Sequence, residues 1–205
     1  MLPTFKPVSM THPRAAPLVG LALLWLACLL TGGAAAASDV VPMRLLHATD
    51  PGVRGALALL THLGGYAALL GLTLAAAAWL GSRQRWGDVG LLLAVTLGGR
   101  LLIEGQKLLI ARPRPLITEQ LVVVWSKSFP SAHAGNSTVV YLTLALLLTR
   151  GRGGPAAAVA LALAIGASRV ALGVHWPTDV IGGWCFGALW VALAYSAAAG
   201  RLGSR

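Results

Sequence analysis

The sequence predicts an all-α membrane protein, a polytopic bundle of six transmembrane helices. Of its 205 residues, 57% are hydrophobic and only 11% are charged, whereas soluble domains carry about 25% charged residues. The hydrophobic residues gather in runs close to the roughly 20 residues that a helix needs to cross a bilayer. The length suits one domain, which we place at residues 17–200, between cytoplasmic tails at 1–16 and 201–205.

Six apolar runs are expected to form the helices. They cover residues 17–37, 55–80, 89–110, 134–148, 155–172 and 179–199. The first run is followed by the small residues GGAAAAS, so a cleaved signal peptide is the alternative to a first membrane helix. We favour the uncleaved helix, and both alternatives put the polar loop at 38–54 on the outer side of the membrane.

The basic residues in the loops predict the orientation. The net charge is +10, from 16 Lys and Arg against 6 Asp and Glu. With both termini in the cytoplasm, the short inner loops at 81–88 and 150–154 are basic, as the positive-inside rule requires. The outer cations lie beside polar motifs, so we expect the chemistry at the outer face. No basic run with interleaved aromatic residues occurs, which argues against nucleic acid as a partner.

A cluster of cations marks the outer end of the third run, in the stretch KLLIARPRP that begins at Lys107. Arg112 and Arg114 follow within it, and the prolines end the helix. Arg100 and Glu104 share a helical face with Lys107, and ionisable groups this deep in a membrane helix should face protein rather than lipid. Taken alone, the cluster also suits cations that snorkel to the membrane surface.

The stretch FPSAHAGNS opens the fourth run. Ser131 precedes the helix as a plausible N-cap, and His133 lies in the first turn. Free backbone N–H groups and the positive end of the helix dipole make such an N-terminus a ready anion site. Taken alone, a His in this position more often serves as a structural hydrogen-bonding group.

The stretch SRVALGVHWPTD connects the fifth and sixth runs. Arg169 lies near the outer end of the fifth run, while His175 and Asp179 lie four residues apart at the start of the sixth. This spacing lets a carboxylate hold an imidazole ring. A His held by a carboxylate is the core of a general base or of a nucleophile.

The predicted topology brings all three stretches to one side of the membrane. Cations and oriented N–H groups bind phosphate, one His can attack phosphorus, and a second His can protonate the leaving oxygen. Phosphoryl transfer through a covalent intermediate requires this division of labour. No cluster of Asp and Glu suits magnesium, so we expect no metal and no cofactor, with the cations neutralising the charge.

The three stretches resemble the three signature motifs of the type 2 phosphatidic acid phosphatase (PAP2) family of membrane lipid phosphatases. The first motif, Lys, six residues and Arg-Pro, matches Lys107 with residues 114–115. The second, Pro-Ser-Gly-His, matches residues 130–133, and the third, Ser-Arg, five residues, His, three residues and Asp, matches residues 168–179. The chain departs from the family pattern at Ala132, where the family has Gly, and we expect slightly altered phosphate contacts there.

The resemblance implies a role for each motif residue. His175 is the nucleophile that forms a phosphohistidine, Asp179 orients it, and His133 is the general acid for the leaving group. The implied phosphate-binding residues are Lys107, Arg114, Ser131 and Arg169. No metal is implied, and the role of the extra cation Arg112 is left open.

We expect a membrane enzyme that hydrolyses a lipid phosphomonoester or diphosphate, with its active site on the periplasmic side of a bacterial inner membrane. Its partners would be membrane lipids and the lipid phosphate substrate. We place undecaprenyl diphosphate first among the substrates that the resemblance implies, ahead of phosphatidylglycerophosphate and phosphatidic acid. The alternatives are a lipid phosphotransferase with the same site, a non-enzymatic protein that binds anionic lipid, and a vanadate-dependent oxidation, which membrane embedding disfavours. The oligomeric state is left open.

Overall fold

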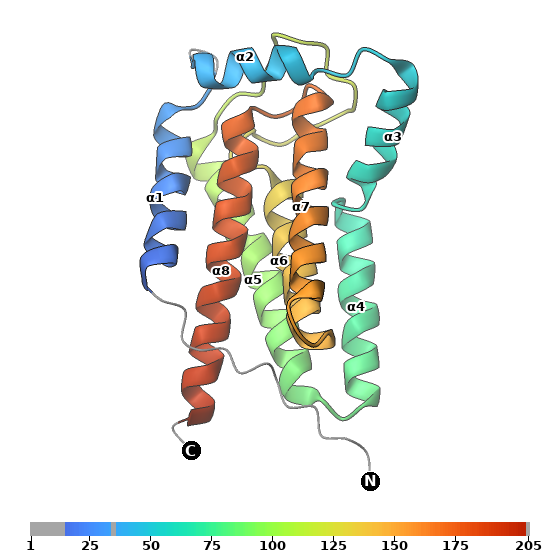
Figure 1. The fold of residues 1–205 in the computed structure, drawn as a ribbon, viewed down its shortest axis with the longest axis vertical. Helices are drawn as coiled ribbons and strands as arrows, with labels where there is room; N and C mark the ends of the chain where they lie inside the picture. Colours follow the sequence, from blue (N-terminus) through green and yellow to red (C-terminus); the bar gives the residue numbers. More distant parts are fainter. Residues whose placement is uncertain (1–14, 34–35, 204–205) are drawn as a thin grey trace.

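The computed structural model describes residues 15–33 and 36–203, and the regular secondary structure in these ranges is entirely helical (Figure 1). The helices are α1 (Ala15–Thr31), α2 (Ala37–Leu46), α3 (Pro51–His62), α4 (Tyr66–Ser82), α5 (Trp86–Ile110), α6 (Ala132–Leu148), α7 (Gly153–Ala171) and α8 (Pro177–Gly203). The prediction of an all-α fold is confirmed. The tail predicted at residues 1–16 lies, up to residue 14, outside the described residues.

The helix α6 forms the centre of the bundle, with α5, α7 and α8 packed around it (Figure 1). Most of its residues are buried, as expected of a helix that is apolar on all sides. Small residues let α8 approach closely, because a Cβ atom at Gly183 would lie 2.8 Å from the carbonyl oxygen of Ser131. The core is therefore built around the helix whose first turn carries His133.

Three helices of the described chain are long and apolar enough to cross a membrane: α5, α7 and, over residues 177–198, α8. The helices α3 and α4 would together form a fourth span, bent by 40°. The helices α1 and α6 are apolar but have 17 residues each. These six apolar units coincide with the six predicted runs, while the number that crosses the bilayer stays a prediction.

The outside of the bundle is apolar. Large hydrophobic side chains are strongly exposed on several helices, among them Leu30, Leu59, Leu101 and Leu109. A soluble protein rarely exposes so much contiguous apolar surface. Surface of this kind suits the hydrocarbon core of a membrane.

The second predicted run is broken next to the cavity described below. The helix α3 ends at His62 and α4 begins at Tyr66. A Cβ atom at Gly64 would collide with the side chain of Ile165 and lie 3.3 Å from Cδ2 of His133. The missing side chain thus lets the α3–α4 connection approach α6 and α7 more closely than any other residue would allow.

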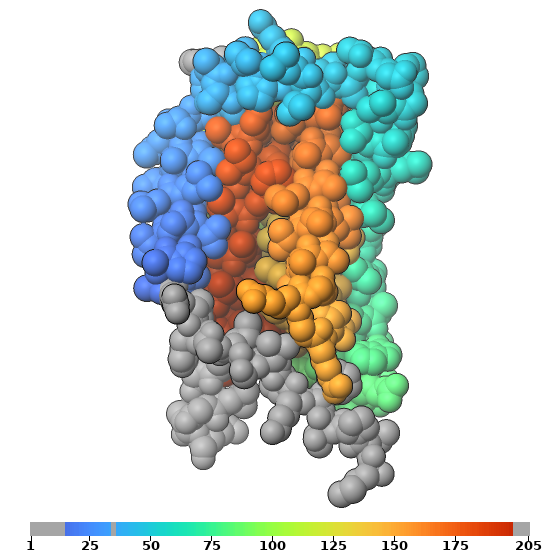
Figure 2. Space-filling view, in the orientation of Figure 1, coloured from blue at the N-terminus to red at the C-terminus, as the bar shows by residue number. Residues whose placement is uncertain are grey.

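The outer connection at residues 38–54 is not the polar loop that the sequence predicts. It contains α2 and the start of α3, and α2 crosses the outer ends of α7 and α8 (Figure 2). Met43 is buried in a cluster with Val170 and Trp176, and Asp39 is also fully buried. The loop prediction was wrong because polarity shows only that this stretch cannot cross the bilayer, not that its apolar side finds a surface to pack on.

Candidate active site

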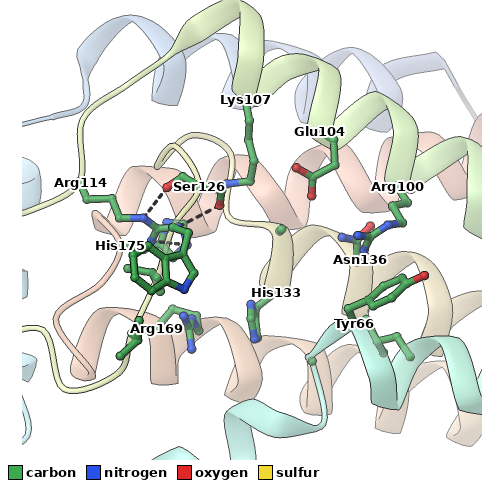
Figure 3. Close-up of a pocket in the computed structure, with 16 residues that line it drawn as sticks. Tyr66, Arg100, Glu104, Lys107, Arg114, Ser126, His133, Asn136, Arg169 and His175 are labelled. Atoms are coloured by element: carbon green, nitrogen blue, oxygen red, sulfur yellow. Dashed lines mark hydrogen bonds between the residues drawn. The ribbon is translucent and has the colours of Figure 1, made fainter.

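At one end of the bundle, the ends of several helices surround a cavity of about 230 Å³ (Figure 3). The last turns of α5 and α7, the first turn of α6 and the turn before α8 all contribute to it. The motif residues that line the cavity are Lys107, Arg114, Ala132, His133, Arg169 and His175. The structure thus brings together the three stretches that lie far apart in the sequence.

Two of the cavity cations are held by backbone carbonyl groups. Lys107, only 2% exposed, donates a hydrogen bond from Nζ to the carbonyl oxygen of Lys127 at 2.6 Å. Arg114 donates from Nε to the carbonyl oxygen of Ser126 and from Nη1 to that of Val174. These contacts fix the side chains at the cavity wall without neutralising their charge.

The third cation, Arg169, is 3% exposed in the last turn of α7. Its Nη1 donates to Oγ1 of Thr61 at 2.8 Å, while its Nε is buried without a hydrogen-bond partner. None of the ion pairs in the described chain involves the three cavity cations. A fourth cation, Arg100, and one carboxylate, that of Glu104, also line the cavity, so positive charge is in excess there. Such an excess away from water is costly unless an anion offsets it, so the cavity suits a phosphate group.

His175 lies in the turn between α7 and α8 and is 2% exposed. Its Nε2 is 3.2 Å from Nη1 of Arg114, and its Nδ1 is 3.4 Å from Oδ2 of Asp179. Burial, reinforced by the nearby cations, holds the pKa of His175 well below its ordinary value of 6.5. The ring is therefore neutral near pH 7. With the proton on Nδ1, the lone pair of Nε2 faces the cavity wall and accepts the hydrogen bond from Nη1 of Arg114.

We predict that the ring of His175 in the free enzyme stays neutral as the pH falls through 6.5. Because its pKa is lowered in the folded state, the nucleophile is lost only in more acidic solution than an ordinary imidazole requires. The stability linked to this group is fully present above pH 6.5 and is lost as the pH falls, because the unfolded chain takes up the proton first. NMR titration of histidine-labelled protein measures the pKa, with His175→Asn for assignment. A His175 signal that titrates at or above 6.5 would contradict the prediction.

Asp179, fully buried at the start of α8, contacts other groups besides His175. Its Oδ1 accepts a hydrogen bond from Nη1 of Arg112 at 2.9 Å. Its Oδ2 accepts from Oγ of Ser128 and from the backbone N–H of Trp176. Since Oγ of Ser128 is also 3.5 Å from Nδ1 of His175, Asp179 and Ser128 together hold the imidazole.

The N-terminus of α6 presents side chains that lack partners. Ser131 occupies the N-cap position, but its Oγ makes no capping hydrogen bond and is buried without a partner. Ser131 itself does not line the cavity, whereas Ala132 and His133 do. The imidazole of His133 makes no hydrogen bond within the described part of the chain and points into the cavity (Figure 3). Ala132 has no positive φ, so Ala in place of Gly causes no backbone strain.

Arg112, whose role the sequence leaves open, is not part of the cavity wall. Its Nη1 contacts Asp179 at 2.9 Å and Oγ1 of Thr178 at 3.0 Å. Its Nη2 donates to the carbonyl oxygens of Cys28 and Leu29 near the end of α1. Arg112 is therefore a structural link between α1, α8 and the carboxylate behind His175.

Two residues next to the site carry no sequence signal. Asp39 of α2 accepts hydrogen bonds from the backbone N–H and Oγ1 of Thr178, at 2.8 and 2.6 Å, and so braces the residue that precedes Asp179. In the sequence, Asp39 is indistinguishable from a solvated loop carboxylate. Ser128 is one of several polar residues in the outer loop, and only its position just before the second motif could have indicated its contact with Asp179.

A family model of the PAP2 superfamily matches residues 88–202, which is more than half of the chain. The chain belongs to the PAP2 superfamily. The matched region contains the three motifs, so the resemblance that they suggest is confirmed. As a PAP2 phosphatase, the protein is an integral membrane enzyme of the phosphoric ester hydrolase class. The non-enzymatic lipid binder considered from the sequence is therefore set aside.

A sequence relative and a solved structure, both from Bacillus subtilis, extend the likeness to most of the chain. Phosphatidylglycerophosphatase B of strain 168 is 32% identical over 176 residues, which are 82% of this chain and 86% of the relative. The crystal structure of a PAP2 type phosphatidylglycerolphosphate phosphatase matches with a TM-score of 0.82 and 30% identity, over 90% of this chain and 96% of that one. The crystal structure of Aquifex aeolicus LpxE matches with a TM-score of 0.64 and 21% identity, over 81% of this chain and 98% of that one, and supports the fold alone.

Proposed function

We propose that this PAP2 phosphatase removes the terminal phosphate of a membrane lipid through a phosphohistidine on His175, at the outer face of a bacterial inner membrane. The observation that carries the proposal is the composition of the cavity. Two buried cations, Lys107 and Arg169, and the partly buried Arg114 surround a neutral imidazole, and none of the three has a carboxylate partner among the described residues. This arrangement suits binding and attack of a phosphate.

Phosphatidylglycerophosphate is the substrate that we favour. Both the sequence relative and the solved structure from Bacillus subtilis are named as phosphatidylglycerophosphate phosphatase, at 32% and 30% identity over most of this chain. This reverses the order expected from the sequence, in which undecaprenyl diphosphate came first. Phosphatidic acid remains the third candidate.

The first chemical step transfers the phosphoryl group to the enzyme. Lys107, Arg114 and Arg169 hold the phosphate oxygens and neutralise the charge that develops on them. The lone pair on Nε2 of His175 forms a bond to phosphorus as the bond from phosphorus to the lipid oxygen breaks. The bound phosphate anion offsets the charge of the surrounding cations and so favours the protonated form of His133. His133 then gives its proton to that oxygen, and the dephosphorylated lipid leaves as an alcohol.

The second step releases phosphate. A water molecule attacks the phosphohistidine, and His133, now neutral, takes a proton from it. The N–P bond breaks, and the electron pair returns to Nε2 of His175. Throughout both steps Asp179 and Ser128 hold Nδ1 of His175, which keeps the ring in the orientation that directs Nε2 to the cavity.

We expect the purified full-length enzyme in mixed micelles to release inorganic phosphate from phosphatidylglycerophosphate with a higher kcat/KM than from phosphatidic acid or undecaprenyl diphosphate. EDTA should leave the rate unchanged, because side-chain cations neutralise the phosphate. Activity that is lost with EDTA and restored by a divalent metal would contradict this mechanism. A phosphorylated acceptor lipid in place of free phosphate would identify a phosphotransferase.

A further inference from the structure

A row of three ionisable side chains projects from one face of α5 into the cavity (Figure 3). Lys107 is at the outer end of the row, Glu104 follows, and Arg100 is at the inner end. Since the α-helix rises 1.5 Å per residue, Arg100 lies about 10 Å deeper along the helix axis than Lys107. The mechanism above uses Lys107 and leaves Glu104 and Arg100 without a role.

No carboxylate of the described chain neutralises Arg100. Its guanidinium lies over the ring of Tyr66, with Cζ 4.0 Å from the ring centroid. Glu104 is one turn away on the same helix and is not within ion-pair distance. A cation this deep in a membrane span is costly without a partner. Its position in the cavity wall indicates that the partner is a bound anion.

The inner end of the cavity leads into a second space of about 320 Å³ between α4, α5 and α6. Both spaces are lined by Tyr66, Leu69, Arg100 and Asn136. The remainder of the second space is largely apolar, with Leu70, Leu97, Leu101 and Val140 in its wall. A lipid with its phosphate at His175 and its tail in this apolar space must pass Glu104 and Arg100.

We propose that Glu104 and Arg100 form a headgroup subsite for a second phosphate, separated from the first by a three-carbon spacer that bears a hydroxyl group. This rests on the proposed function. Arg100, with Asn136 beside it, would bind the inner phosphodiester, and the carboxylate of Glu104 would accept a hydrogen bond from the spacer hydroxyl. The ligand class is a glycerol-spaced bisphosphate lipid, such as phosphatidylglycerophosphate.

The spacing distinguishes the candidate substrates. A glycerol spacer separates two phosphorus atoms by about 7 Å when extended, and the long side chain of Arg100 can cover the remaining distance along α5. The second phosphate of a diphosphate is bonded through one oxygen, so it would lie near Glu104, where like charges repel. Phosphatidic acid has no second phosphate, so Arg100 should not increase its affinity.

The test compares variants of the full-length enzyme on phosphatidylglycerophosphate and phosphatidic acid. In Arg100→Gln, the ratio of the two kcat/KM values should fall about 10- to 100-fold, as expected for a lost charge-assisted hydrogen bond. Arg100→Lys should restore part of the ratio. Arg83→Gln is the matched control, because Arg83 also lies over an aromatic ring, that of Trp79, at the other end of α4. The control should leave the ratio unchanged.

Competition by soluble headgroups tests the subsite without the lipid tail. Glycerol 1,3-bisphosphate should inhibit the wild-type enzyme more strongly than glycerol 1-phosphate or pyrophosphate, and Arg100→Gln should abolish that advantage. An unchanged substrate ratio in Arg100→Gln, or equal inhibition by the three compounds, would overturn the subsite while leaving the proposed function intact. A wild-type enzyme that releases no phosphate from any of the lipids would refute both.

Discussion

The His175→Ala enzyme should release phosphate at least about four orders of magnitude more slowly than the wild type, because no N–P bond can form without the imidazole. In the proposed mechanism His175 supplies the attacking atom, and a neighbouring group could replace it only by moving into the turn before α8. Phosphate release from phosphatidylglycerophosphate in mixed micelles measures the loss. His47→Ala is the control, because the ring of His47 bonds the carbonyl oxygen of Glu119 and does not line the cavity.

The proposed covalent intermediate provides a second readout of the same substitution. Rapid quenching with radiolabelled lipid phosphate should trap label on the wild-type protein in an acid-labile, alkali-stable form, as a phosphohistidine requires. The His175→Ala protein should carry no label, while His47→Ala should label normally. A His175→Ala protein that is still phosphorylated on histidine would show that another ring is the nucleophile.

Replacing Arg169 with Met should lower kcat/KM by about 100- to 1,000-fold and leave the thermal stability equal to or above that of the wild type. The loss of activity follows from removing a charge that stabilises the transition state. The stability is retained because Arg169 is a buried cation without a carboxylate partner, so an apolar side chain of similar size relieves a desolvation cost. Phosphate release and thermal unfolding in the same detergent measure the two effects.

Arg112→Met is the matched comparison for Arg169→Met. Arg112 is also buried, but it pairs with Asp179 and bonds two carbonyl groups of α1. Its removal leaves a buried carboxylate without its cation, which typically costs about 3–5 kcal/mol. We therefore expect a clear fall in the unfolding temperature of Arg112→Met. If Arg169→Met were the less stable of the two, the distinction between a ligand-binding cation and a structural one would be wrong.

Most of the helical framework could be predicted because its signal is local. Each apolar run depends on composition within about 20 residues, which is the length that the bilayer sets. The sequence did not predict α2 or the break between α3 and α4, because both depend on contacts with distant parts of the chain. Met43 is buried only because Val170 and Trp176 lie beneath it, and the break at Gly64 serves an approach to His133 from a distant helix.

The site motifs were predictable for a related reason. The spacing between His175 and Asp179 and the position of His133 at a helix start are short-range features, and the topology places them on one side of the membrane. The direction in which side chains point was not predictable within the irregular stretch after α5. Arg112 and Arg114 are two residues apart, yet Arg112 contacts Oδ1 of Asp179 whereas Arg114 contacts Nε2 of His175.

The sequence by itself determined that this is a helical membrane phosphatase and that its three motifs gather at one end of the bundle, because hydropathy and motif spacing are properties of short segments. Only the tertiary structure decided which cations line the cavity and which, like Arg112, are paired with a carboxylate. It alone showed that Asp39 and Ser128 support the residues around His175, and that Glu104 and Arg100 share a cavity with Lys107. The physical reason is that burial and charge pairing depend on groups from other helices, which no local pattern contains.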